Sequence, residues 1–255
     1  MQIEVLGCSG GIAGGARTTA FRIDDDLLLD AGTGVSDLSQ AQMQALRHVI
    51  LTHAHLDHTA GLPLLLDTVY DTAGEALHVH ALPQTVSALR EHMFNWSLWP
   101  DFSQLPSPER PTLAFDPLDA RQARVLGERR VLFSRVNHTV PAAACVLVAP
   151  SGAVFAFSGD TTTNEAFWET LNALPRLDVL VTECAFDNAH RELADRSRHY
   201  CPATLGADLA KLRHRPELYL SHLKPSVTEA VLEQVAEAAP NFQPAALKQG
   251  QRFTL

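Results

Sequence analysis

The chain has 255 residues, of which 46% are hydrophobic, and a formal net charge of −9 at pH 7. This apolar content allows a sizeable buried core, and the length suits one large domain or two small ones. The negative charge argues against broad electrostatic capture of nucleic acid, but not against a small anionic substrate, because metal ions can supply local positive charge.

Short apolar runs bounded by Gly, Pro, Asp or Asn predict strands, in two groups before and after residue ~120. Helical patterns lie between some of them, and the last has Ser226 or Thr228 as a cap. Strands with helices in each group predict two sheets packed together with helices outside. The predicted strands are 2–6, 19–23, 27–29, 48–52, 77–80, 131–136, 144–148, 153–157, 178–182 and 217–221, and the predicted helices are 37–46, 60–69, 83–94, 164–173, 203–213 and 226–238.

Two segments do not fit this pattern. The glycine-rich residues 7–15 lack the GK[ST] ending of a phosphate loop, so we expect a tight loop that approaches the active site. Residues 95–124 are aromatic, proline-rich and irregular, which indicates either a lid, binding loop or subunit contact, or a packed surface excursion. Trp96, Trp99 and Phe102 could stack on a base or line a dimer contact, and the sequence does not decide between these roles.

The cysteines and the hydropathy pattern predict a cytoplasmic protein without a membrane partner. The four cysteines form no CxxC pair, which fits reduced thiols better than a disulfide framework. No apolar run approaches the ~20 residues that span a membrane. The opening residues are strand-like and do not read as a signal segment.

Residues 53–58, His-Ala-His-Leu-Asp-His, place four metal-binding side chains in six positions. His53 and His55 lie two apart, so an extended chain points both to the same side. Asp57 and His58 follow where the chain turns into a helix, so one pair can bind one ion and the next pair a second. Imidazole nitrogen is a suitable ligand for Zn, Fe, Mn or Ni. The alternative is a polar loop that happens to be rich in histidine, but such a loop would not be accompanied by further ligands downstream.

Such ligands follow in His138, Asp160 and His222, each at the end of an apolar strand where a sheet edge can present side chains to a common cleft. Seven ligands are enough for three per ion plus one shared carboxylate, which describes an open catalytic site. We expect two divalent metal ions, assigned as Zn, with Mn or Fe as alternatives.

The motif HxHxDH, the later His, the Asp after a strand and the final His occur in the order found in metallo-β-lactamase fold hydrolases, which the chain resembles over essentially its whole length. The resemblance implies a single domain, 1–255, with an α/β (α+β) fold: an αββα four-layer sandwich of two mixed β-sheets flanked by helices. It further implies that Asp160 bridges the ions and that Asp30 orients a ligand imidazole, although Asp30 could also be a turn residue. By the same resemblance, one ion is held by His53, His55 and His138, and the other by Asp57, His58 and His222.

Motif details resemble the class II cyclic-nucleotide phosphodiesterases and their bacterial relatives. The similar segments are 30–34, 53–63, 99–102 and 221–225. One departure is Leu64-Leu65-Leu66-Asp67-Thr68, where the eukaryotic members usually carry an apolar run with Ser-Pro or Ser-Ala.

A second resemblance competes, because Glu183 and His199 look like the Glu and His that ribonuclease Z enzymes place near the scissile phosphate. The cyclic-nucleotide phosphodiesterases have a similar His-x-x-Pro, as in residues 199–202, so the pair does not separate the two families. The alternatives are a surface acid, or an acid that only supports a metal ligand, for Glu183, and an ordinary loop histidine for His199.

The resulting hypothesis is a phosphodiesterase that hydrolyses 3′,5′-cyclic nucleotides (cAMP or cGMP) to 5′-monophosphates by attack of a metal-bridging hydroxide. Catalytic roles fall to Asp57, Glu183 and His199, with His199 protonating the departing alkoxide. Lys224 either touches a phosphate or is a solvated surface lysine. We expect a small cyclic nucleotide as partner, no extended nucleic acid, and a homodimer. The alternatives are a ribonuclease Z-like tRNA 3′-processing enzyme or other phosphodiester hydrolase, a thioester or lactone hydrolase, and a metal-binding sensor.

Overall fold

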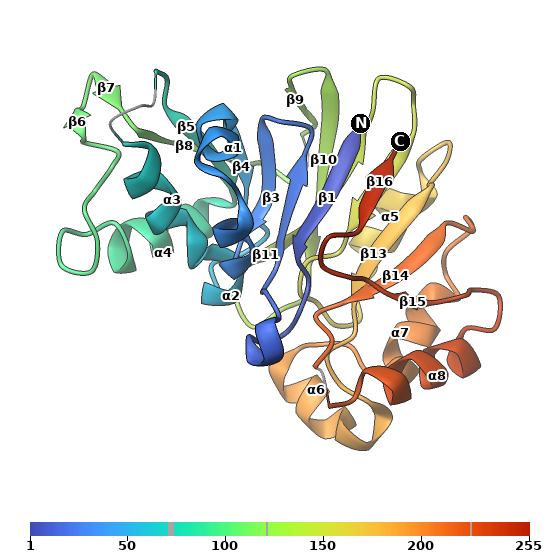
Figure 1. Ribbon diagram of the computed structural model, residues 1–255. Helices are drawn as coiled ribbons and strands as arrows, with labels where there is room; N and C mark the ends of the chain where they lie inside the picture. The colour runs from blue at the N-terminus through green and yellow to red at the C-terminus, as the bar shows by residue number, and fades with distance from the viewer. Residues whose placement is uncertain (71–73, 121, 225) are drawn as a thin grey trace. The chain divides into compact units, whose positions relative to one another are not determined.

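The computed structural model describes residues 1–70, 74–120, 122–224 and 226–255 (Figure 1). The chain forms two compact units. Unit 1 comprises residues 1–7, 17–119 and 249–254, and unit 2 comprises residues 8–16, 120–248 and 255. The boundary near residue 120 agrees with the predicted division of the strands into two groups. Within the described residues, no helix has the length and apolar character needed to cross a bilayer.

Unit 1 contains a seven-stranded mixed sheet in the order β16-β1-β2-β3-β4-β5-β8. The strands from β16 to β3 pair antiparallel, whereas β3, β4, β5 and β8 pair parallel, so this half of the sheet has its carboxyl ends at one edge. The strands are β1 (Gln2–Gly7), β2 (Ala20–Ile23), β3 (Leu27–Ala31), β4 (His48–Ile50), β5 (Leu77–Ala81), β8 (Leu113–Pro117) and β16 (Arg252–Thr254).

Apolar side chains of α3 and α4 pack with alternate residues of β3, β4 and β5, such as Leu28, Val49 and Val79, in the core of unit 1. α1 begins at a capping box made by Ser39 and Gln42. The helical segments of this unit are η2 (Thr33–Asp37), α1 (Gln40–Ala45), α2 (Leu56–Thr59), α3 (Gly61–Val69) and α4 (Pro83–His92), and a small ribbon is formed by β6 (Pro106–Ser107) and β7 (Arg110–Pro111).

Unit 2 contains a second seven-stranded mixed sheet, in the order β15-β14-β13-β12-β11-β10-β9. β12, β13, β14 and β15 are parallel neighbours, so the segments that follow them start from the same edge, where open α/β sheets bind their ligands. The strands are β9 (Arg124–Leu126), β10 (Arg129–Val136), β11 (Ala142–Val148), β12 (Val154–Phe157), β13 (Val179–Glu183), β14 (Glu217–Ser221) and β15 (Ala245–Ala246).

Helices α7 and α8 lie side by side in unit 2 (Figure 1), and their apolar faces join Trp168 of α5 in the core of this unit. The predicted caps of α8 are wrong. The N-cap is Val227, and the Thr228 hydroxyl donates to the Lys224 carbonyl instead. The helical segments are η1 (Ala13–Gly15), α5 (Ala166–Asn172), η3 (Asn188–His190), α6 (Arg191–Ser197), α7 (Pro202–Leu209) and α8 (Thr228–Ala238).

Residues 95–120 are more ordered than the sequence indicates, since they include β6, β7 and the sheet strand β8. Phe102 is buried in the core of unit 1, where its ring meets Tyr70 at 5.7 Å between centroids. The prediction that Phe102 stacks on a base or lines a dimer contact is therefore wrong. Trp99 is half-buried against the same core, and Trp96 is exposed.

Candidate functional site

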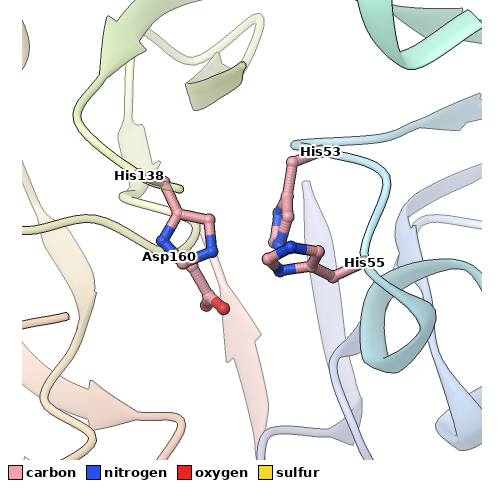
Figure 2. A group of neighbouring side chains, drawn as sticks. All are labelled: His53, His55, His138 and Asp160. Carbon is pink, nitrogen blue, oxygen red and sulfur yellow. The ribbon is translucent and has the colours of Figure 1, made fainter. Parts of the chain in front are cut away.

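Unit 1 brings its four predicted metal ligands together on one short turn. Residues 51–55 connect β4 to α2 and bend at Thr52 and Ala54, and the His53 and His55 rings meet edge-on with 4.7 Å between centroids (Figure 2). α2 then begins at Leu56, which puts Asp57 and His58 in its first turn. The His53 and His58 rings lie 4.3 Å apart, and His58 Nε2 lies 3.7 Å from Asp57 Oδ2.

The buried carboxylate of Asp30 holds the His58 ring in place. Asp30 is in the last part of β3 with a left-handed φ of 56°, a strained conformation for a residue other than glycine. Its Oδ2 accepts a hydrogen bond from His58 Nδ1 at 2.7 Å, and its Oδ1 accepts one from the Thr52 amide at 2.8 Å. Burial raises the pKa of the Asp30 carboxyl, and the bonds from His58 and Thr52 act in the opposite direction.

These contacts select the tautomers of two histidines. Because the Thr52 hydroxyl donates its one proton to Asp30, its oxygen accepts from His53 Nδ1 at 3.0 Å. Both His53 and His58 therefore carry the proton on Nδ1, which leaves the Nε2 lone pair as the metal-binding donor. Gly32 permits the Asp57 backbone to lie this close to the end of β3, since a Cβ at position 32 would lie 2.2 Å from the Asp57 carbonyl oxygen.

Unit 2 brings together its three predicted ligands in segments that follow β10, β12 and β14. Asp160 and His222 are buried, and Asp160 Oδ1 lies 3.2 Å from His222 Nδ1. His138, shown with Asp160 in Figure 2, donates from Nδ1 to the Arg198 carbonyl at 3.0 Å, so its Nε2 is again the metal-binding donor. His222 has a left-handed φ of 57°, and a Cβ on Gly10 would lie 2.7 Å from its carbonyl oxygen. The glycine-rich loop thus lies against a predicted ligand.

Glu183 and half-buried His199 form a pair beside Asp160, with one ligand atom of each of the three residues within 4.8 Å of the others. Glu183 is fully buried at the end of β13, and its Oε1 accepts from His199 Nδ1 at 2.8 Å. Three backbone amides, of Thr161, Ala185 and Tyr200, also donate to this carboxylate.

The charge on His199 is set by this pair. Burial lowers the pKa of His199, but the charge and the hydrogen bond of Glu183, together with the charge of Asp160, outweigh burial and raise the pKa to about 9. Since the Nδ1 proton is hydrogen-bonded to Glu183, the proton that this imidazolium can transfer is the one on Nε2. The His199 ring stacks on His222 and meets His138 edge-on, with centroids 5.0 Å apart in both cases.

Lys224 is half-buried two residues after His222, and its ammonium lies 4.1 Å from the centroid of the Phe186 ring. Its charge acts to lower the pKa of His199. Pro225, the last residue of the 221–225 motif, lies outside the described residues.

Sequence reasoning missed Thr52 and Arg198. Thr52 adjoins the His-rich motif but carries no ligand chemistry. Arg198 donates from Nη1 to the His138 carbonyl at 2.8 Å across a separation of 60 residues, which no local pattern signals.

The donor set fits divalent metal ions. Neutral imidazole nitrogens and carboxylate oxygens are ligands for Zn, Mn and Fe alike. The fit rests on the tautomers, because three histidines already present Nε2 through bonds made at Nδ1.

Comparison with known proteins agrees with this reading. Residues 26–242 match the family model described as "Beta-lactamase superfamily domain". A Yersinia pestis protein named "Probable 3′,5′-cyclic-nucleotide phosphodiesterase" is 24% identical over 88% of this chain and 78% of its own length. The ribonuclease Z of Haloarcula marismortui is 26% identical over 95% of this chain and 92% of its own length.

Among solved structures, unliganded yeast PDE1 superposes with a TM-score of 0.84 and 17% identity, covering 100% of this chain and 99% of that one. This likeness confirms the predicted α/β fold class with mixed sheets flanked by helices. The chain therefore belongs to the beta-lactamase superfamily and is a hydrolase with the metallo-β-lactamase fold.

Proposed function

We propose that the protein is a dinuclear metal-dependent phosphodiesterase that converts 3′,5′-cyclic nucleotides to 5′-monophosphates. The observation that carries the proposal is the hydrogen bond between half-buried His199 and fully buried Glu183, with its Nδ1–Oε1 distance of 2.8 Å. Expulsion of a sugar alkoxide from phosphorus is assisted by a proton donor, and a protonated imidazole fixed by a carboxylate is suited to that task. The relatives named as cyclic-nucleotide phosphodiesterases, from Yersinia pestis and Aliivibrio fischeri, favour this substrate class.

The metal ligands are assigned by residue type and tautomer. Each proposed set contains only side chains that could hold a divalent ion. We assign the ions as Zn, with Mn or Fe as alternatives, because the same donors accept all three. One set is His53, His55, His138 and Asp160, and the other is Asp57, His58, His222 and Asp160, so that Asp160 is shared.

Bound ions would activate a water molecule as the nucleophile and neutralise charge on the phosphoryl oxygens. As the bond between phosphorus and O3′ breaks, His199 donates its Nε2 proton to the departing O3′. Glu183 keeps the imidazole protonated and oriented through Nδ1. Asp57 has a catalytic role as the ligand on the partly exposed side of the turn, and Lys224 contacts the phosphate as a point charge.

A ribonuclease Z-like nuclease is the second candidate. It is favoured by the Haloarcula marismortui relative, which matches over 92% of its own length. The net charge of −9 weighs against an RNA substrate, since tRNA binding draws on basic surface. A small cyclic nucleotide needs no such surface.

We extend the proposal to a cytoplasmic homodimer, whose stoichiometry light scattering would measure.

The test uses protein loaded with Zn²⁺ or Mn²⁺ and four substrates: 3′,5′-cAMP, 3′,5′-cGMP, a 2′,3′-cyclic nucleotide and a tRNA precursor with a 3′ trailer. We expect 5′-monophosphate from a 3′,5′-cyclic nucleotide and a loss of ~10²-fold or more in H199A. A matched control is H190A, because His190 is bonded to Asp187 in a similar histidine–carboxylate pair outside the site. Cleavage of the tRNA precursor without hydrolysis of either 3′,5′-cyclic nucleotide would replace the proposal with the second candidate.

A further inference from the structure

Phe186 lies three residues beyond Glu183, where the chain leaves β13. Its ring is buried in a small apolar cluster with Ala185, Ala194 and Cys201. Ala194 belongs to α6, so that helix helps to fix the ring. The sequence offers no motif that marks Phe186, and the mechanism above gives it no task.

The ring supports the ammonium of Lys224. Nζ lies 4.1 Å from the ring centroid, well inside the range of a cation–π interaction. A lysine side chain has four flexible carbon–carbon bonds and a compact charge, so without a support its head samples many positions. The aromatic face therefore restricts the Lys224 ammonium to the region beside the Phe186 ring.

The same ring also contacts the proposed proton donor. The Phe186 and His199 rings meet edge-on, with centroids 5.9 Å apart and an interplanar angle of 64°. His199 in turn stacks on His222 at 5.0 Å. One buried phenyl ring therefore touches both the lysine and the histidine that would act on opposite parts of a phosphodiester.

We propose that Phe186 is a positioning residue that holds the Lys224 ammonium where it binds the anionic phosphoryl oxygen of the substrate. This inference rests on the proposed phosphodiesterase function and adds a residue to it. Phe186 itself does not touch the substrate; it acts through Lys224. A leucine at this position keeps most of the apolar volume but removes the quadrupole that attracts the ammonium.

A double-mutant cycle tests the inference, using F186L, K224A and the double variant in metal-loaded protein. We expect K224A to raise KM about 10-fold and F186L to raise it about 5-fold, with kcat changed less than about 2-fold. Once Lys224 is gone, F186L should change KM by less than about 2-fold, because the ring has lost the group that it positions. The inhibition constant of inorganic phosphate should follow the same pattern.

A matched control is F242L. Phe242 is another buried ring beneath a cation, with the Arg215 guanidinium 5.1 Å from its centroid, in a part of unit 2 that we give no role in binding. F242L should lower the melting temperature and leave KM unchanged. If F186L does not fold, F186M takes its place with the same expectation.

The inference fails if the F186L and K224A effects on KM multiply, or if F242L raises KM as much as F186L does. Running the cycle on both cAMP and bis(p-nitrophenyl) phosphate separates this failure from failure of the proposed function. Coupling on the generic diester in a protein that hydrolyses no cyclic nucleotide would sink the substrate assignment and keep the role of Phe186. If the protein hydrolyses cAMP but the F186L and K224A effects on KM multiply, the substrate assignment stands and the role of Phe186 is refuted.

Discussion

Replacement of Glu183 by Gln tests the charge on His199 directly. Gln keeps nearly the size of Glu and one amide oxygen that can accept from His199 Nδ1, but it removes the negative charge. In the native protein, burial lowers the pKa of His199, and Glu183, together with the charge of Asp160, outweighs burial and raises the pKa to about 9. Without the charge of Glu183, burial is opposed only by Asp160 and the weaker bond to the amide, and we expect the pKa of His199 to fall to about its ordinary value of ~6.5.

The size of the effect follows from these two pKa values. At pH 7.5, a group with a pKa of ~9 is ~97% protonated, whereas one with a pKa of ~6.5 is ~9% protonated. Loss of the proton alone therefore lowers the rate about 10-fold, and poorer alignment of the imidazole lowers it further, towards the ~10²-fold loss of a missing general acid. The Thr161 amide donates to Glu183 Oε1, as His199 does, whereas the amides of Ala185 and Tyr200 donate to Oε2, so E183Q also leaves these two amides facing the NH2 group of the glutamine.

Two measurements check this prediction. NMR titration of the His199 ring in metal-free protein should show a fall of two pKa units or more in E183Q. The kcat of metal-loaded E183Q on bis(p-nitrophenyl) phosphate should recover in part as pH is lowered towards 6, unlike that of H199A. A His199 pKa that is the same in wild type and E183Q would refute the reasoning.

Further predictions concern the metal ligands and their supports. D160A should abolish turnover and lower the metal content per chain, which elemental analysis measures; near-normal activity in a metal-replete sample would contradict the shared ligand. D30N should weaken metal binding about 10- to 100-fold in chelator competition, because the amide is a poorer acceptor for His58 Nδ1 than the carboxylate is. R198G removes the Nη1 bond but keeps the carbonyl that accepts from His138, and it relieves a left-handed φ of 53°. Thermal stability should therefore stay within about 1 kcal/mol of wild type, and a loss of more than 2 kcal/mol would show that the guanidinium bond dominates.

The fold could be predicted where the pattern was strong. Each of the ten predicted strands overlaps an observed one, because each is a short apolar run with a turn residue at its end. Helix α6 was missed because Arg191–Ser197 is almost entirely polar and buries only Ala194. The predicted helix 37–46 is broken at Leu38 and Ser39, which are extended, since Ser39 caps α1. Strand β8 was missed because the prolines before it suggested a loop.

The site could be predicted where a residue binds through its own chemistry. The His-rich motif is read from the sequence because four donors are adjacent, and Asp160 and His222 because they end strands. Arg198 holds the His138 ring through its backbone carbonyl, which every residue type has. The residue type at position 198 therefore does not reveal this role in the sequence. Phe186 is similar, since a buried phenylalanine is ordinary core until its neighbours are known.

The metal-binding tautomer of His53, His58 and His138 is selected within the unit that contains each histidine. In unit 1, Asp30 and Thr52 fix Nδ1–H of His58 and His53, and in unit 2 the Arg198 carbonyl fixes that of His138. None of these contacts needs a metal ion, so these three histidines present Nε2 before an ion arrives, and binding costs no tautomer change. Asp30 and Arg198, which fix two of these histidines, have left-handed φ values, so the chain accepts local strain at both positions. Metal affinity in this protein should therefore depend on residues that never touch an ion, and among them is Asp30, whose buried carboxyl group holds His58 through its Nδ1.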